Sequence, residues 1–530
     1  MPETVDGLGY IPYVILGGYL AMLLAFGIRG YCQSQDTEED YYLAGRDQGW
    51  LVSALTIMAT FFSSFALLGA PGMVYRDGVV FALFSLNVPV AGVAVYVLGS
   101  RIRRIVQERG FLTPADMIAD HYGSPVALRL LVALIGVLYA VPYVVIQIQA
   151  GGILSQMMFQ SPHAFEVGAA VLALITMLYI MIGGMRSVAW TDVVQGVLLV
   201  GGMLLAGVCA VAVMGGPISF FEAVAKLPPK SLSAPGTTGY WQPEILFTAS
   251  LFASVGSMIQ PAQWMRFYAA RSNAVLRRSA LIFAAVLTAC FFFGVMLVGL
   301  GGQVLYPLVD GAGAYRLDAA GHVLPHVMVG ESTRDFDRIL VVMLQNHLPE
   351  LLGSFGAVLA ALILVAIMAA AMSTADSNLH AMSALLTHDV YDQYIRPQAS
   401  QSERTWVGRG VIAVATVVAL ILVIASRHSP TNPLGMIVIL GLLAIAFATQ
   451  LLPLTIDMLF IKKGSRLGAI GGVITGLVIV FVLSPFWPMV AGSTLGDVVG
   501  AMKRMFDVGA WGVLGNALIF VLMSIWTRNK

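Results

Sequence analysis

Thirteen apolar segments, separated by shorter polar ones, follow one another along the chain. Each holds roughly 18 to 30 residues, enough to cross a hydrocarbon core of about 30 Å at 1.5 Å per helical residue. None alternates like the strands of an outer-membrane barrel. The pattern predicts an all-α membrane protein with spans near 9–29, 50–75, 78–100, 126–158, 163–182, 190–213, 246–263, 278–303, 351–375, 406–426, 434–460, 466–484 and 508–527.

The basic residues between the spans predict an orientation. Arginines gather at 101–109 and 266–278, and lysines at 462–463. Because short cytoplasmic loops carry an excess of Lys and Arg, this spacing places the N-terminus outside and the C-terminus in the cytoplasm. The chain begins with an acidic stretch and lacks the basic region of a cleaved signal, so the first span is expected to be retained. Segments 335–349 and 111–121 are expected to lie as amphipathic helices on the outer and inner faces.

Composition narrows the class of protein further. Hydrophobic residues make up 58% of the chain and charged residues only 11%, with a net charge of +1. Soluble domains carry about 25% charged residues, and a nucleic-acid partner would need a basic face. The sequence has no Gly-Lys-Ser/Thr phosphate loop, and no nucleophile–base pair suggests an enzyme. The three cysteines are far apart, which favours buried apolar roles over a disulfide.

The ninth span carries a polar stripe. Ala370, Ser373, Thr374 and Ser377 recur at helical spacing on one face. Paired hydroxyls beside a free carbonyl would suit a small cation, but small residues that allow close helix packing explain the stripe equally well. Asp376 favours function, because a carboxylate in a membrane helix needs a partner or a cation. Alternatively, it lies at the watery end of the helix against a basic loop residue.

Two spans contain helix-breaking residues. The second span holds Ser63, Ser64 and Pro71, and the seventh holds Gln260 before Pro261. A broken helix exposes carbonyl and amide groups at mid-membrane, where transporters build ion and solute sites. A simple kink is the alternative. Since the two spans are five helices apart, the interruptions fit two five-helix halves of inverted topology.

Polar residues also enter two other spans. Asp192 and Gln195 begin the sixth span, where a carboxylate would line a cation route or cap the helix. Tyr139, Tyr143 and Gln147 form a polar stripe in the fourth span, which fits a solute cavity or an interfacial anchor.

At these residues the sequence resembles the sodium/solute symporter family, which includes proline, pantothenate, monocarboxylate, sialic-acid and sugar carriers. The resemblance rests on DYYLAGRDQGW (40–50), GGMRSVAWTDVVQG (183–196), GSMIQPAQWMRFYAARS (256–272) and AAAMSTADSNL (369–379). It implies a LeuT-type fold in a single polytopic domain over 1–530. One extra N-terminal helix (9–29) would precede a ten-helix inverted-repeat core (50–460), followed by two C-terminal helices (466–527).

The resemblance also implies ion sites. Sodium would lie between the first and eighth core helices, and the matching positions are the carbonyls of Ala59, Phe62 and Ala370 and the hydroxyls of Ser373 and Thr374. Some family members bind a second sodium, and the positions matching that site are Asp192, Asp376 and Ser377. Asp376 stands where the family usually has a hydroxyl, which leaves both the second ion and its identity open.

The solute is less constrained. The family's cavity would be lined here by Phe61, Phe65, Tyr143, Gln147, Ser257, Gln260 and Gln450. Phe61 stands where proline carriers have an acidic residue, which argues against a copy of a proline carrier. The expected function is sodium-driven uptake of a small organic acid or amino-acid-like solute, with a sugar carrier or a non-transporting sensor as alternatives. Sodium, the solute and lipid are the expected partners, in a monomer or weak oligomer of the inner or plasma membrane, with no other cofactor.

Overall fold

A computed structural model describes residues 11–33, 37–124, 126–159, 161–306, 335–428, 437–484 and 494–528. In these ranges the chain is helical, and pairing of extended backbone is limited to one isolated bridge between Gln48 and Ala270. The helices of the first half are α1 (Ile11–Cys32), α2 (Glu38–Leu43), α3 (Trp50–Phe61), α4 (Ala70–Asp77), α5 (Val80–Leu83), α6 (Asn87–Ala94), α7 (Ser100–Arg109), α8 (Pro114–His121), α9 (Ala127–Met158), α10 (Ala164–Val213), α11 (Pro217–Val224) and α12 (Pro229–Leu232).

The second half continues the same helical architecture. Its helices are α13 (Pro243–Ile259), α14 (Pro261–Ala269), α15 (Asn273–Cys290), α16 (Leu297–Leu305), α17 (Ile339–Ala384), α18 (Gln401–His428), α19 (Ile437–Ala448), α20 (Leu452–Ile456), α21 (Arg466–Leu483), α22 (Thr494–Met505) and α23 (Val508–Arg528). Single π-helical stretches join several of these, including 65–69 between α3 and α4 and 385–395 after α17.

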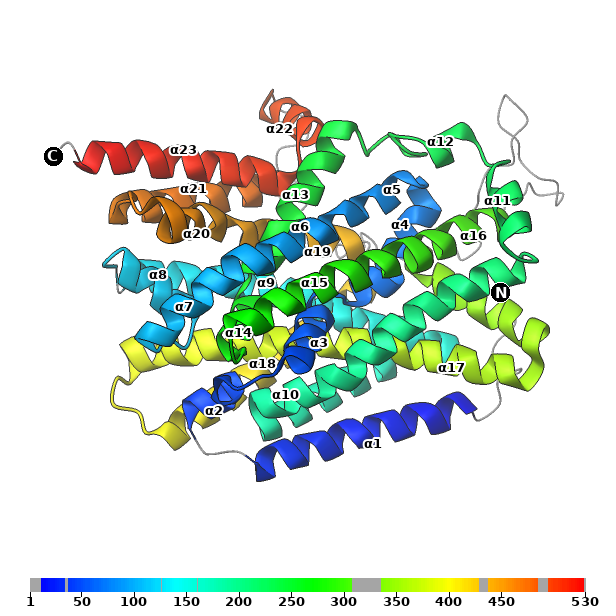
Figure 1. Ribbon diagram of the computed structural model, residues 1–530, viewed down its shortest axis with the longest axis horizontal. Helices are drawn as coiled ribbons and strands as arrows, with labels where there is room; N and C mark the ends of the chain where they lie inside the picture. Colours follow the sequence, from blue (N-terminus) through cyan, green and yellow to red (C-terminus); the bar gives the residue numbers. More distant parts are fainter. Residues whose placement is uncertain are drawn as a thin grey trace.

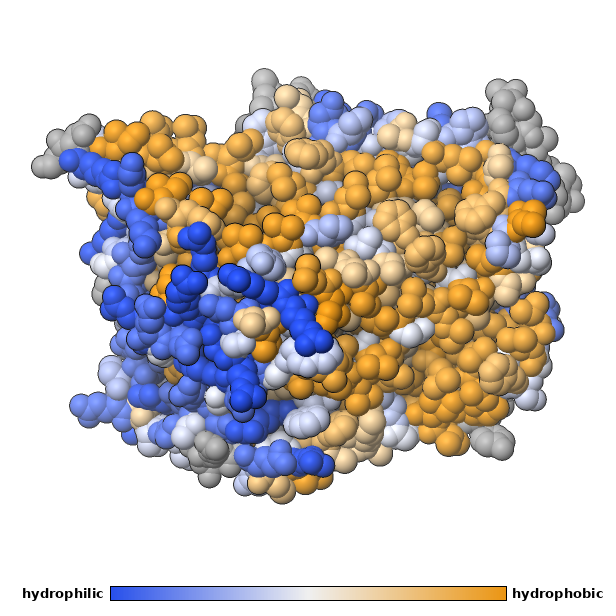
Figure 2. All heavy atoms as spheres, in the orientation of Figure 1, coloured by the Kyte–Doolittle hydropathy of each residue, from blue (hydrophilic) through white to orange (hydrophobic). Residues whose placement is uncertain are grey.

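The long helices run along one common direction (Figure 1). Ten helical segments of the described chain are long and apolar enough to cross a membrane, and counting each of two bent helix pairs as one span raises the number to twelve. Figure 2 shows a broad hydrophobic surface along the bundle and hydrophilic residues gathered at the end where α2, α7 and α8 lie. The predicted all-α membrane architecture is confirmed.

Both predicted interruptions are present. The chain leaves helical geometry at Phe62 (φ −92°, ψ 90°), and α3 meets the segment Phe65–Asp77 at a bend of 58°. In the seventh span, Gln260 adopts an extended conformation before Pro261, and α13 bends by 52° into α14. Proline at the first position of α14 removes a backbone donor that would otherwise lack a partner.

Two further helices change direction at glycine. In α10, Gly184 adopts φ 54° and ψ −152°, and in α17, Gly353 adopts φ 56° and ψ −137°. The helix that begins at Ile339 therefore turns before it enters the membrane-length part of α17. That part continues without interruption through Ala384, well beyond the predicted end at residue 375.

The centre of the molecule is built by five helices. α10 and α17 pack against each other, and α1, α3 and α9 pack around them. α21 and α23 form a separate antiparallel pair at the opposite side of the bundle from α1 (Figure 1). The broken helix α3, the kinked α10 and α17 thus meet where the polar residues of the sequence are concentrated.

Candidate functional site

The break after α3 lies against the polar stripe of α17. The Ser373 hydroxyl donates to the Ala59 carbonyl at 3.1 Å and lies 3.1 Å from the Ala370 carbonyl. The Thr374 hydroxyl donates to the same Ala59 carbonyl, also at 3.1 Å. All of these residues are fully buried. Since the helix ends at Phe61, carbonyls of its last turn lack their usual amide donors and accept from side chains instead.

Four of the five residues predicted for sodium therefore converge through their oxygens. The fifth, Phe62, is the residue at which the chain turns out of the helix. Oxygen atoms from two carbonyls and two hydroxyls are the neutral, hard ligands that a small alkali cation accepts. Hydroxyl hydrogens rotate freely, so Ser373 and Thr374 can turn their lone pairs toward a cation without moving the backbone.

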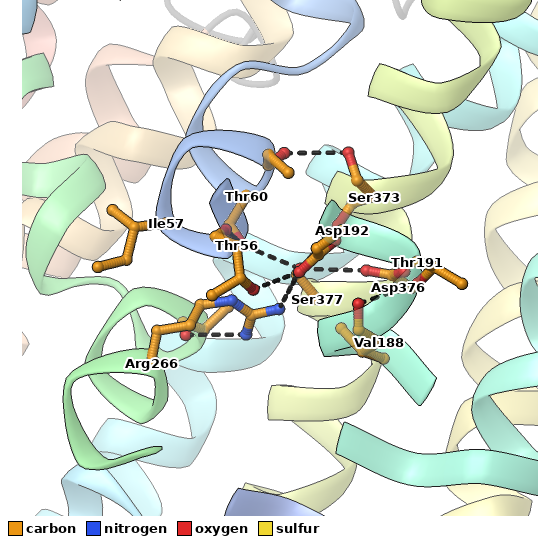
Figure 3. Close-up of polar contacts among 12 residues, drawn as sticks. Thr56, Ile57, Thr60, Val188, Thr191, Asp192, Arg266, Ser373, Asp376 and Ser377 are labelled. Atoms are coloured by element: carbon orange, nitrogen blue, oxygen red, sulfur yellow. Dashed lines mark hydrogen bonds and ion pairs between the residues drawn. The ribbon is translucent and has the colours of Figure 1, made fainter. Parts of the chain in front are cut away.

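A second buried cluster lies one helical turn further along α17 (Figure 3). The Arg266 guanidinium of α14 hydrogen-bonds the Ser377 hydroxyl and lies 3.6 Å from the Asp192 carboxylate of α10. Thr56 of α3 donates a hydrogen bond to the same carboxylate. Arg266 and Asp192 are both 0% exposed. Four helices thus converge on one ion pair with no access to water.

Asp376 belongs to the same cluster but has different partners. One of its carboxylate oxygens accepts from the Tyr179 hydroxyl of α10 at 2.6 Å, and the other lies 3.1 Å from the Ser377 hydroxyl. The side chain is 0% exposed. The alternative that Asp376 lies at a watery helix end against a loop residue is therefore wrong, because α17 continues for another two turns and the residue packs against α10.

α1 contributes to this region as well. The Gln195 amide donates to the Tyr19 hydroxyl at 2.8 Å, and both side chains are buried. The helix that precedes the predicted core thus supplies a buried polar group that is bonded to α10 one helical turn after Asp192.

Sequence reasoning missed several members of this cluster. The positive-inside pattern places Arg266 in a cytoplasmic loop, whereas the residue lies in α14 and is fully buried. Thr56 and Thr60 precede the break at helical spacing, with Thr60 3.0 Å from Ser377. Tyr19 and Tyr179 carry no local signal that separates them from other tyrosines of membrane spans.

Gln147 ties α9 to the break. Its amide oxygen accepts from the Ser64 backbone N–H at 3.1 Å and from the Ser64 hydroxyl at 2.7 Å, and its amide nitrogen donates to the Tyr143 carbonyl. One glutamine side chain thus satisfies the first amide group after the break. The Gln147 side chain therefore stabilises the broken conformation of the second span, and it does not line an open cavity.

A small cavity of about 20 Å³ adjoins the break. Of the residues predicted for the solute cavity, Phe61, Phe65, Tyr143 and Ser257 line it. At this size it has room for about one water molecule. The structure therefore represents a conformation in which the predicted solute cavity is closed.

The remaining predicted residues lie elsewhere. The Gln260 side chain accepts from the Ala262 N–H at 2.6 Å and caps α14. Gln450 lies against α23, where Asn516 donates to its backbone carbonyl at 2.8 Å, and the Gln450 amide packs against Gly476 and Gly512. In this conformation neither side chain lines the cavity.

The fold is that of a multi-pass membrane protein whose buried polar residues meet at a helix break. The chain belongs to the sodium:solute symporter family, whose model matches residues 41–476. Members of this family couple the movement of a small solute to sodium, and the chain is accordingly a sodium-coupled symporter of a small solute. The predicted family and the predicted sodium-coupled symport of a small solute are confirmed.

Known proteins of similar sequence support the same assignment. A protein named sodium/proline symporter from Staphylococcus aureus (strain bovine RF122 / ET3-1) is 27% identical over 89% of this chain and 85% of its own length. A protein of the same name from strain JH9 is 26% identical over 91% of this chain and 87% of its own length.

Two solved structures show the fold. A Na+-coupled sialic acid symporter in a substrate-bound outward-open state superposes with a TM-score of 0.74 at 20% identity, covering 98% of both chains. Mhp1, a nucleobase-cation-symport-1 family transporter in a closed conformation, superposes with a TM-score of 0.53 at 15% identity, covering 92% of this chain and 94% of its own. The likeness extends over almost the whole chain.

Proposed function

We propose that this symporter binds its coupling sodium at Ala59, Phe62, Ala370, Ser373 and Thr374, and that alternating access about this site drives solute uptake. The observation that carries the proposal is the contact of two α17 hydroxyls with one α3 carbonyl at the helix break. A sodium ion held there would join α3 to α17. Its binding and release would therefore change how firmly the broken helix is held against the rest of the bundle.

The second proposed cation position, at Asp192, Asp376 and Ser377, is already partly filled by protein. The Arg266 guanidinium contacts two of the three residues. A second sodium there would have to displace the guanidinium or lie beside it, and two like charges within a few ångströms in a dry site repel strongly. Coupling by one sodium per solute is therefore the simplest arrangement, with Arg266 as a permanent positive charge.

The proposed topology has thirteen membrane helices in one domain over 1–530. Dividing α10 at Gly184 gives two helices of spanning length in place of one, which raises the count from twelve to thirteen. α1 begins and α23 ends at opposite ends of the bundle (Figure 1), as an odd number of crossings requires. The two bends lie five spans apart, as expected for two inverted five-helix repeats in the core at 50–460.

The proposed orientation puts the start of α1 outside and the end of α23 in the cytoplasm. The hydrophilic end of the bundle in Figure 2 includes the arginine-rich α7. By the positive-inside bias this end faces the cytoplasm of a plasma membrane. We propose that the protein works there as a monomer or weak oligomer in lipid, needing no cofactor besides sodium.

The proposed solute is a small organic acid or amino-acid-like compound. The cavity wall combines the aromatic rings of Phe61 and Phe65 with the polar side chains of Tyr143 and Ser257. Helix breaks of transporters suit a carboxylate, which here would replace the Gln147 oxygen at the Ser64 amide. The named relatives are a sodium/proline symporter and a sialic acid symporter, and both proline and sialic acid have a carboxylate.

The experiment that tests the proposal is a solute screen in proteoliposomes containing the purified protein. Amino acids, small carboxylates and sugars would be offered with an inward sodium gradient and, in parallel, with choline in place of sodium at constant pH. We expect a carboxylate solute to accumulate only with sodium. Uptake that survives in choline would contradict sodium coupling, sugar uptake would contradict the proposed solute class, and no uptake of any compound would favour a sensor.

A further inference from the structure

Exposed arginines gather on two neighbouring helices at the hydrophilic end of the bundle. They are Arg101 and Arg104 of α7 and Arg277 and Arg278 of α15, and the two helices are in contact. Within the described ranges, no carboxylate forms an ion pair with any of these four residues. α7 contains a single acid, Glu108, and α15 contains none. This arginine patch therefore carries positive charge that the protein does not neutralise.

Other arginines at the same end of the bundle are neutralised by acids. Arg186 donates to Asp40 at 2.8 Å, and Arg396 lies 2.7 Å from Glu403. Basic residues are expected at the cytoplasmic ends of spans in any membrane protein. The arginine patch differs from the rest of this end because its positive charges have no acidic partners, so an anion from outside the protein would complement them.

Aromatic rings hold three of the four guanidinium groups in place. The contacts, measured from the guanidinium carbon to the ring centroid, are Arg101 to Phe460 at 4.3 Å, Arg277 to Tyr96 at 5.3 Å and Arg278 to Trp50 at 4.1 Å. The three rings are themselves 39–43% exposed, as is typical of aromatic side chains at the boundary between lipid and water. A guanidinium that stacks on a ring keeps N–H groups at its edge for an anion.

The arginine patch adjoins an apolar surface on the same helices. α6 and α15 approach so closely that a Cβ on Gly92 would lie 2.8 Å from the Cβ of Ala284. Beside this contact, Val93 of α6 is 62% exposed and Leu281 of α15 is 67% exposed. Figure 2 shows the hydrophilic end meeting the hydrophobic surface where α7 and the start of α15 lie. A ligand that fits both surfaces has an anionic head and an apolar tail.

We infer that the arginine patch binds the phosphate headgroup of an anionic phospholipid, whose acyl chains lie against α6 and α15. The planar guanidinium groups match phosphate oxygens in pairs, and basic groups next to membrane spans attract anionic lipids. The surface is preformed, because Arg103 of α7 donates to the Ala270 carbonyl at 2.6 Å and so ties α7 to the loop before α15. This lipid site does not depend on the proposed sodium site.

The test uses phosphatidylglycerol as the probe and phosphatidylcholine with the same acyl chains as the neutral comparison. Purified full-length protein in a non-ionic detergent would be titrated with each lipid, and bound lipid would be counted by native mass spectrometry. We expect the anionic lipid to bind more than about tenfold tighter, since each arginine near an anionic headgroup contributes about fivefold in affinity. A large excess of inorganic phosphate should not displace it, because free phosphate makes no contact with the apolar surface of α6 and α15.

Variants locate the binding to the arginine patch. Arg277→Gln and Arg278→Gln should each weaken phosphatidylglycerol binding about fivefold, and the double variant about 25-fold. Arg396→Gln removes the same charge from an arginine that an acid already neutralises, so it is the matched control and should bind as the wild type does. Thermal unfolding would verify that each variant is folded. If the double variant does not fold, Arg101→Gln/Arg104→Gln tests the same patch with the same expectation.

Three results would overturn the inference. Equal affinities of the wild type for the two lipids would show that the headgroup charge is not recognised. Equal losses in Arg277→Gln and Arg396→Gln would show that only the total charge of the protein matters. Displacement of the lipid by inorganic phosphate would identify a site for a free anion in place of a lipid. None of these results bears on sodium coupling, which the uptake experiment tests separately.

Discussion

The guanidinium of Arg266 lies 3.6 Å from the carboxylate of Asp192, and neither side chain reaches water. The two residues come from α14, which follows one helix break, and from the half of α10 that follows Gly184. Their contact therefore joins two parts of the bundle whose backbones are interrupted. A buried ion pair of this kind adds little to stability by itself, but the loss of one partner leaves the other charge unpaired in a dry site.

We expect Arg266→Gln to destabilise the folded protein by about 3–5 kcal/mol, because it leaves Asp192 without its cation. The double variant Arg266→Gln/Asp192→Asn should recover part of this loss. Thermal unfolding of purified protein in detergent, followed by size-exclusion chromatography, measures both. Equal losses in the single and double variants would show that the pair is not coupled.

Replacing either hydroxyl of the proposed sodium site should weaken sodium binding. Ser373→Ala or Thr374→Ala removes one ligand and leaves a strong helix former, so the apparent sodium affinity should fall about tenfold or more, equivalent to about 1.4 kcal/mol. Radioactive sodium binding measures this directly. Thr416→Ala is the matched control, since that hydroxyl donates only within α18. Unchanged sodium affinity in Ser373→Ala would mean that the polar stripe of α17 serves helix packing and does not bind sodium.

Gln147 offers a test of the helix break. Gln147→Ala leaves the buried Ser64 N–H without its acceptor, which costs about 1–3 kcal/mol. Gln149, two residues further along α9, is equally buried, and its amide atoms have no hydrogen-bond partner among the described residues. Gln149→Ala should therefore lower the melting temperature less than Gln147→Ala. The reverse order would mean that Gln147 does not support the break.

Substitutions at Gly184 and Gly353 distinguish two ways in which an added side chain destabilises the protein: steric overlap with a neighbour, and backbone strain at a positive φ. At Gly184 a Cβ would lie 2.7 Å from the ring of Tyr41, in addition to the strain of a positive φ. At Gly353 the φ is similar but no atom lies within 4 Å of the added carbon. Gly184→Ala should therefore reduce folded yield and melting temperature more than Gly353→Ala. Equal losses of yield and melting temperature in the two variants would mean that backbone strain alone destabilises them.

The sequence predicts the local parts of this site well. The stripe Ala370, Ser373 and Thr374 follows from helical spacing, and the breaks near Ser63 and Pro261 follow from residue type. The pairing of this stripe with Ala59 is implied only by the family resemblance, and the structure shows the contact. The sequence puts Arg266 in a loop because nothing nearby in the chain reveals Asp192, which lies 74 residues earlier. The resemblance assigns Gln450 to the family's cavity, but a match of positions does not show that α23 covers this residue in the present conformation.

A charged group at the hydrophilic end of the bundle supports a further prediction. Arg129 of α9 lies 2.6 Å from Asp116 of α8 and also binds Asp389, and His388 lies 3.1 Å from Asp116. Burial by itself raises the pKa of Asp116, but the hydrogen bond and charge of His388, together with Arg129, outweigh it and hold the pKa of this carboxyl below its usual range. Asp116 therefore stays ionised at neutral pH, and the stability that it contributes is lost only as the pH falls below about 4.

Asp116, His388 and Asp389 are residue types that bind zinc. In this protein the guanidinium of Arg129 lies between the carboxylates, where a metal ion would bind. One ligand atom from each of Asp116, His388 and Asp389 lies within 4.8 Å of the others, and three such ligands with an open fourth position suit zinc. In the wild type the guanidinium of Arg129 bonds both carboxylates, so added zinc should leave the melting temperature unchanged. Arg129→Gln should melt at a lower temperature, because the buried Asp389 loses its partner, and micromolar zinc should restore part of the loss. The variant Arg129→Gln/His388→Ala should not respond to zinc, and an equal response in the wild type would show that Arg129 does not block the site.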